Sequence, residues 1–197
     1  MFIVFEGIDG SGKTTQAEIL ARKLTSLGIP NILTREPSDG VVGQNLRRLE
    51  TRLTPEEESR LFLEDRLDHV EKVIRPGIRN HEHVICDRYY HSSAAYQGSR
   101  GLNPIDVLRE NRLRVPAPDI VFLIDISVST ALSRIGKCRP GGFSIFEKVT
   151  ELEKVAAIYN TFNDPYIRRI NGEKPLPELR LEILGHLKNE GLKICCV

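Results

Sequence analysis

Neither sign of charge is in excess in this 197-residue sequence, which has 28 lysines and arginines against 27 aspartates and glutamates. The formal net charge at pH 7 is therefore +1. Proteins that hold nucleic acid polymers or membrane surfaces through their overall charge need a clear excess of positive charge. The balance argues against both of these classes of partner.

Long apolar runs are also missing, because no stretch approaches the roughly 20 residues that a membrane-spanning helix requires. The apolar start, residues 1–5, is too short for a signal peptide and is expected to form a strand. The four cysteines form no disulfide framework, since Cys195 and Cys196 are adjacent, Cys86 lies in an apolar run and Cys138 in a basic segment. We expect reduced thiols in a cytoplasmic protein.

The most distinctive feature that is present follows the first apolar stretch, where the sequence reads G-x-x-x-x-G-K-T from Gly7 to Thr14. Glycine at Gly7 and Gly12 lets backbone N–H groups curl around a phosphate. Lys13 can reach the outer phosphates, and the Thr14 hydroxyl suits a magnesium ion. The alternative is a glycine turn without a ligand. The candidate residues of this P-loop for binding a triphosphate are Gly7, Ile8, Asp9, Gly10, Ser11, Gly12, Lys13, Thr14 and Thr15.

Short apolar runs alternate with longer helical patterns along the chain, which is typical of parallel strands joined by crossover helices. The expected strands are residues 2–6, 31–35, 83–86, 120–125 and 192–197. The expected helices are residues 13–27, 42–49, 55–75, 104–113, 130–135, 144–162 and 178–190. Thr54 is the expected cap of the helix 55–75, and Ser129 is the expected cap of the helix 130–135. Pro76 is expected to bend or end the helix 55–75. We predict an α/β fold, a doubly wound five-stranded parallel sheet with helices on both faces, in a single domain of residues 1–197.

The segment 136–143 has no expected helix or strand. It is basic and rich in glycine, and it lies between two expected helices. A surface connection is the simplest interpretation, but the composition also suits a mobile lid over phosphates, at about residues 134–148.

A second charged position follows the apolar stretch Val84-Ile-Cys86, where Asp87 and Arg88 are adjacent. The carboxyl ends of parallel strands meet at one edge of the sheet, so Asp87 should lie close to the P-loop and could hold Mg²⁺ together with Thr14. Asp125 fits the same pattern, but Arg88 favours Asp87, because a phosphoryl acceptor also needs positive charge. The alternative is an ion pair at a strand end with no ligand.

Three motifs together resemble the thymidylate kinase (dTMP kinase) family over essentially the whole chain. They are Phe5-Glu-Gly-Ile-Asp-Gly-Ser-Gly-Lys-Thr-Thr15, Thr34-Arg-Glu-Pro37 and Asp87-Arg-Tyr-Tyr-His-Ser-Ser-Ala-Ala-Tyr-Gln-Gly98. The resemblance implies a nucleoside monophosphate kinase, often a homodimer, that phosphorylates dTMP to dTDP with ATP and Mg²⁺ in dTTP biosynthesis. A kinase of the same fold that acts on dUMP or another nucleoside monophosphate is the alternative. A GTPase-like switch is the alternative from another class of proteins. The sequence has neither an Asn-Lys-x-Asp motif, which reads guanine, nor an Asp-x-x-Gly switch motif at a suitable place.

The resemblance also implies which residues hold the acceptor nucleotide. Phe62 and Arg66 match the aromatic ring and the arginine that hold thymine, and they lie four residues apart on one side of a helix. Tyr96 matches an aromatic residue beneath the deoxyribose, where it would crowd a 2′-hydroxyl. The implied set for dTMP is Asp9, Arg35, Phe62, Arg66, Arg88, Ser93, Tyr96 and Gln97, with Arg35 and Arg88 on its phosphate.

The source of catalytic charge differs within the family, where some members have an arginine directly after the P-loop aspartate. This chain has Gly10 there, which implies basic residues in the lid instead, as in archaeal-like members. The candidates are Arg134, Lys137 and Arg139, with Lys148 as a weaker one. The chain departs from the usual family pattern in the acceptor loop and in the lid. After Arg-Glu-Pro37, bacterial members usually have Gly-Gly-Thr, whereas this chain has Ser38-Asp39-Gly40. In the lid, an arginine that often precedes Phe146-Glu147 is missing.

Overall fold

The computed structural model of the chain describes residues 1–49, 51–138 and 145–192. In these residues, five parallel strands form one sheet in the order β2-β3-β1-β4-β5. The strands are β1 (Phe2–Glu6), β2 (Asn31–Arg35), β3 (His83–Asp87), β4 (Ile120–Asp125) and β5 (Ile167–Asn171). The predicted α/β fold with a five-stranded parallel sheet is confirmed.

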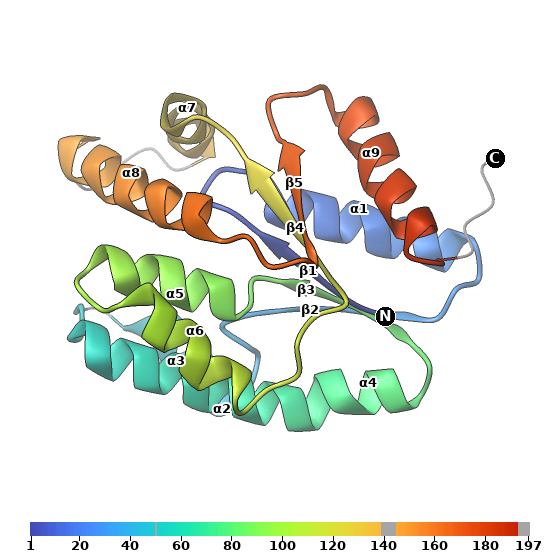
Figure 1. Cartoon of the computed structure of the whole chain (residues 1–197), viewed down its shortest axis with the longest axis horizontal. Coiled ribbons are helices and arrows are strands. Elements are labelled where there is room, and N and C mark those ends of the chain that lie inside the picture. The colour runs from blue at the N-terminus through green and yellow to red at the C-terminus, as the bar shows by residue number, and fades with distance from the viewer. Residues whose placement is uncertain (50, 139–144, 193–197) are drawn as a thin grey trace.

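Helices cover both faces of the sheet (Figure 1). Helices α1 (Lys13–Ser26) and α9 (Leu176–Asn189) lie on one face. The other face is covered by α3 (Pro55–His69), α4 (Arg75–Arg79), α5 (Tyr90–Ser99), α6 (Pro104–Arg112), α7 (Val128–Cys138) and α8 (Ile145–Thr161), while α2 (Val41–Arg48) packs beside α3. None of the helices in the described ranges is long and apolar enough to cross a bilayer.

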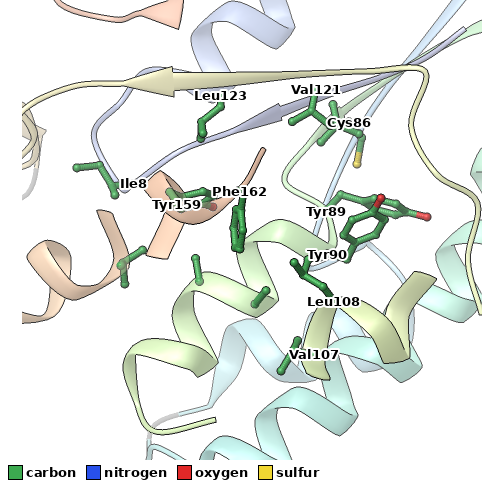
Figure 2. Packing of buried hydrophobic residues seen from close by; sticks show 14 of the residues in the cluster. Ile8, Cys86, Tyr89, Tyr90, Val107, Leu108, Val121, Leu123, Tyr159 and Phe162 are labelled. Carbon is green, nitrogen blue, oxygen red and sulfur yellow. The ribbon is translucent and has the colours of Figure 1, made fainter. Parts of the chain in front are cut away.

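The central strands are apolar on both sides, so each of their residues contributes to one of two cores. In β1, Ile3 and Phe5 pack toward α1 and α9, whereas Phe2 and Val4 pack toward the opposite layer. Figure 2 shows the second of these cores, where the adjacent rings of Tyr89 and Tyr90 lie near Leu108 of α6. Burial on both faces fixes β1 in the middle of the sheet, and the P-loop follows it directly.

The fifth strand was predicted in the wrong place. The edge position beside β4 is taken by β5, Ile167–Asn171, and residues 193–197 of the stretch predicted as a strand lie outside the described part of the chain. The sequence Ile-Arg-Arg-Ile-Asn contains no apolar run, because an edge strand with one partner needs fewer buried side chains. Ile170 alone in β5 is fully buried.

Three helices also differ from the prediction. Helix α5 was not expected, because its serines, alanines and glycine show no amphipathic period. Helix α3 is capped by Thr54 as predicted, but the helical path continues through a π-helical turn, Val70–Ile74, into α4 and past Pro76. Pro76 is tolerated in the first turn of α4, where its missing N–H is not needed. Helix α7 is capped by Ser127, whose Oγ accepts a bond from the Thr130 N–H at 3.2 Å, and not by Ser129.

Gly43 in α2 provides a test of how tightly α2 packs onto the loop that follows β2. A Cβ at Gly43 would lie 2.2 Å from the carbonyl oxygen of Ser38 and 2.6 Å from Oδ1 of Asp65. We expect Gly43→Ala to lower the free energy of unfolding by about 2–3 kcal/mol through overpacking, measured by urea unfolding. A Cβ at Gly185 in α9 meets no described atom within 4 Å outside its own helix backbone. As a control, Gly185→Ala should raise the free energy of unfolding by about 0.5–1 kcal/mol; destabilisation of both variants alike would contradict the packing argument.

Candidate active site

The P-loop turns sharply between β1 and α1 because its glycines adopt conformations that other residues avoid. Gly7, Gly10 and Gly12 have φ angles of 141°, 81° and 96°. At Gly7 a Cβ would also lie 2.5 Å from the carbonyl oxygen of Ile124 in β4. The loop therefore has the backbone shape that the glycine spacing predicts, with its N–H groups at the start of α1.

Lys13 lies almost completely buried within this loop, at 5% exposure. Its Nζ donates a hydrogen bond of 2.8 Å to the carbonyl oxygen of Ile8. Burial, together with the positive charge of Arg88, lowers the pKa of Lys13 to about 7. An anion bound in the loop would favour the charged ammonium and so raise that pKa.

Asp87 at the end of β3 lies beside the P-loop. Strand β3 pairs with β1 so that Asp87 stands opposite Phe5. The Thr14 hydroxyl donates to Oδ2 of Asp87, while Oδ1 is buried and has no partner among the described residues. A hydroxyl and a carboxylate with an unused oxygen are hard ligands of the kind that Mg²⁺ takes, so the pair fits this ion. Asp125, the alternative, ends β4 in an exposed position.

Arg88 connects the P-loop to the next helix. It adopts a φ angle of 72°, uncommon for a residue with a side chain, and its Nη2 pairs with Oδ1 of Asp9. Its guanidinium lies 5.2 Å from the centre of the Tyr96 ring, and the Tyr96 hydroxyl accepts a 3.1 Å bond from the Asp9 N–H. Burial acts to raise the pKa of Asp9, but the charges of Arg88 and Lys13 outweigh it and hold that pKa below its usual value.

A cavity of about 410 Å³ opens next to Arg88, between α3, α5 and the loop after β2. Its lining includes six of the eight residues predicted to hold the acceptor nucleotide, namely Phe62, Arg66, Arg88, Ser93, Tyr96 and Gln97. Phe62 and Arg66 come from α3, and the last three come from α5. Arg52 and Glu151, which also line the cavity, form an ion pair of 2.6 Å between the loop before α3 and helix α8.

Arg66 is the polar centre of this cavity and is only 1% exposed. Its Nε and Nη2 lie 2.8 and 2.6 Å from Oε2 of Glu36, its Nη1 donates to Asn111, and its Nη2 donates to Ser93 at 3.0 Å. Its guanidinium lies 5.2 Å from the centre of the Tyr89 ring. A guanidinium held by so many partners presents its remaining N–H in one direction. Arg66 is therefore a buried and paired charge, not a solvated one.

Sequence comparison agrees with this geometry, since a sequence model described as "Thymidylate kinase" matches residues 5–183. The chain belongs to the thymidylate kinase family. It is 42% identical over 189 residues to the thymidylate kinase of Desulfotalea psychrophila, covering 94% of this chain and 93% of that protein. Identity to the thymidylate kinase of Brachyspira hyodysenteriae is 40% over 188 residues, with coverages of 94% and 92%. The probable thymidylate kinase of Pyrococcus horikoshii, an archaeal relative, is 38% identical over 200 residues, with 96% of each chain covered.

Membership of the thymidylate kinase family confirms the resemblance inferred from the motifs and makes the chain a phosphotransferase. The remaining two residues predicted for the acceptor do not line the cavity. Asp9 lies in the P-loop and reaches the cavity through Arg88. Arg35 stands opposite Asp87 at the end of β2, is 59% exposed in its side chain and pairs with Asp39 at 3.1 Å.

The lid residues predicted for this thymidylate kinase family member are only partly described. Arg134 donates to the carbonyl oxygen of Gly172 at 3.0 Å and, at 3.4 Å, to those of Gly10 and Ser11. It thus lies against the P-loop. Arg139 and the side chains of Lys137 and Lys148 lie outside the described part of the structure.

Two buried carboxylates of the site were missed in the sequence. Glu6 and Glu36 are 0% and 5% exposed. Glu36 holds Arg66 and contacts Nδ1 of His69 at 3.2 Å, while Glu6 receives hydrogen bonds from the chain around Tyr89. For Glu6 the available signal is an acidic residue at the end of an apolar strand, which is costly to bury without partners, whereas Glu36 follows the mixed strand β2 and has no such signal. Arg47, which pairs with Asp39 at 2.9 Å beside Arg35, carried no such signal.

The low pKa of Lys13 predicts that nucleotide binding takes up a proton. At pH 8 most of the Lys13 amines are neutral when the loop is empty, and the phosphates of ADP or ATP should charge them. We expect uptake of close to one proton at pH 8, and an affinity that weakens as the pH rises from 7 to 9. Calorimetric titrations in buffers of different ionisation enthalpy measure this uptake.

The variant Lys13→Met should lose the proton uptake, whereas Lys23→Met, on the same helix, should keep it. Equal uptake by the wild type and Lys13→Met would show that another group titrates.

Proposed function

We propose that this member of the thymidylate kinase family transfers the γ-phosphoryl group of ATP to dTMP, giving dTDP and ADP in the synthesis of dTTP. The observation that carries the proposal is the place of Arg88. This residue lines the acceptor cavity and also pairs with Asp9 of the P-loop. A donor in the P-loop and an acceptor in the cavity would therefore meet at one guanidinium.

On the donor side, the P-loop amides and Lys13 would bind the β- and γ-phosphates. To do so, Lys13 has to exchange its bond to the Ile8 carbonyl for the phosphates. Thr14 and Asp87 would hold Mg²⁺, which supplies positive charge to the phosphates when bound. Asp87 and Thr14 already lie within hydrogen-bond distance of each other, so this pair needs little rearrangement.

On the acceptor side, Phe62 offers a ring for the thymine to stack on, and Arg66 offers a donor to a base carbonyl. Tyr96 would lie beneath the deoxyribose, where its ring leaves little room for a 2′-hydroxyl. Arg88 and Arg35 would hold the acceptor phosphate. The pair between Asp9 and Arg88 keeps that guanidinium in place until the phosphate arrives.

Transfer itself needs no covalent intermediate, because an oxygen of the acceptor phosphate is already a nucleophile. The protein aligns two anions that repel each other, neutralises their charge and excludes water. A loose transition state spreads negative charge over the transferred group, and the lid bases Arg134, Lys137 and Arg139 are the proposed sources of additional positive charge.

We also propose a homodimer, on the family resemblance. The apolar residues Leu63, Val70 and Ile74, between the middle of α3 and the start of α4, are buried within the chain and offer no dimer face. Other apolar side chains remain exposed in the described structure, among them Ile105 and Leu113 at the two ends of α6, at 72% and 81%. Light scattering of the purified protein tests this proposal.

The reaction is tested by following ADP release with dTMP, dUMP and other nucleoside monophosphates as acceptors. We expect turnover with dTMP, and turnover with dUMP that is lower by about 10–200-fold. This is the range that one methyl group, which contributes about 1–3 kcal/mol in a pocket, can account for. Lys13→Ala should abolish turnover and leave the thermal unfolding transition intact. An active Lys13→Ala enzyme would refute the role of Lys13, and ADP release that is independent of any acceptor would favour a nucleotide switch.

The lid bases are ranked by comparing Arg139→Ala, Lys137→Ala and Arg134→Ala. If Arg139 stabilises the transition state, Arg139→Ala should lower kcat by about 10²–10³-fold and change the KM for dTMP little. Initial rates over a range of dTMP concentrations separate the two constants. A large loss of kcat in either of the other two variants, with Arg139→Ala unaffected, would assign the role to that residue instead.

A further inference from the structure

The amide of Gln97 lies beside a charged side chain. Gln97 lies on α5, is 3% exposed and lines the acceptor cavity. Its Nε2 lies 3.4 Å from Oε2 of Glu58, near the start of α3. Its Oε1 is buried and accepts no hydrogen bond within the described residues. The group that Gln97 has left for a ligand is therefore an acceptor.

Glu58 is in turn held by Arg100, which follows α5. Nη1 of Arg100 forms an ion pair with Oε2 of Glu58, and its Nη2 donates to the carbonyl oxygen of Leu53 at 2.6 Å. The two charged side chains are only 16% and 18% exposed. A carboxylate paired with a guanidinium can only accept hydrogen bonds. With the Gln97 amide reversed, two oxygens would face each other, so Glu58 keeps the NH₂ group of Gln97 on its own side.

The polar groups near Gln97 in the cavity, Arg66 and Ser93, can donate hydrogen bonds to a ligand. Arg66 can only donate, and Oγ of Ser93 accepts from Nη2 of Arg66 at 3.0 Å, so that its own proton is available to a ligand. A pyrimidine with an N3–H and a C4 carbonyl matches an acceptor at Gln97 and a donor at Arg66. Cytosine has an acceptor at N3 and an amine at C4, and so opposes both.

We propose that Glu58 is a positioning residue that selects bases protonated at N3 by setting the direction of the Gln97 amide. This inference rests on the proposed function, because it concerns the acceptor cavity of a dTMP kinase. Glu58 and Arg100 also line the cavity, and Glu58 acts on the base through Gln97. It separates thymine and uracil from cytosine, but it does not separate thymine from uracil, since these two share both groups.

The variant Glu58→Gln tests this directly, because a glutamine at position 58 can present either an oxygen or an NH₂ group to Gln97. We expect the ratio of kcat/KM for dTMP to that for dCMP to fall by about tenfold, the order of one hydrogen bond to the base. The loss should lie mainly in the KM for dTMP and dUMP, with the KM for ATP unchanged. Glu58→Asp, which keeps an acceptor, should retain more of the ratio than Glu58→Gln.

Glu56→Gln is the matched control, since Glu56 is exposed on the same turn of α3, and it should leave the ratio unchanged. An unchanged ratio in folded, active Glu58→Gln would overturn the inference, as would an equal loss of kcat with every acceptor, which is the result of a purely structural role. If Glu58→Gln does not fold, Glu58→Ala decides in the same way. A wild type that binds dTMP more tightly than dCMP but transfers no phosphoryl group would contradict the proposed function and leave the positioning role standing.

Discussion

The buried carboxylate of Glu6 is the interaction on which the rest of the site depends. Within the described residues it accepts hydrogen bonds from the N–H groups of Tyr89 and Ser92 at 2.8 and 3.1 Å, and from the hydroxyls of Ser92 and Tyr159 at 2.6 and 2.8 Å. These groups belong to the start of α5 and to α8, whereas Glu6 ends the central strand. A fully buried charge without such partners costs several kcal/mol, so the three elements are held in one arrangement.

That arrangement determines where Arg88 lies. The residue stands between Asp87, whose strand is registered against β1, and Tyr89, whose N–H is held by Glu6. Fixed at both sides, the backbone of Arg88 adopts a left-handed conformation that costs free energy in a residue with a side chain. The guanidinium is thereby directed at Asp9 and Tyr96 instead of away from the P-loop. The same helix α5 that Glu6 anchors then supplies Ser93 and Gln97 to the cavity.

Much of the fold and of the candidate site could be predicted from the sequence, because local patterns indicate the P-loop and the apolar central strands. Phe62, Arg66 and Tyr96, which motif resemblance predicts for the acceptor, line one cavity. What local patterns could not provide was the edge strand β5, which lacks an apolar run, and helix α5, which lacks an amphipathic period. Glu6 and Glu36 were missed for a related reason. A buried acid is tolerated only through partners distant in sequence, such as Tyr159 or Arg66, and no local spacing reveals them.

The acceptor phosphate that Arg88 is proposed to hold would have to displace a counter-ion, because Arg88 is paired with Asp9. Arg88 already has a counter-ion, so a monovalent ion such as chloride brings no more charge than the carboxylate that it would displace. A phosphate dianion brings twice that charge and additional oxygens for hydrogen bonds. A phosphate site at this pair would therefore discriminate by valence, and common salts would compete for it less than for an exposed cluster of lysines and arginines.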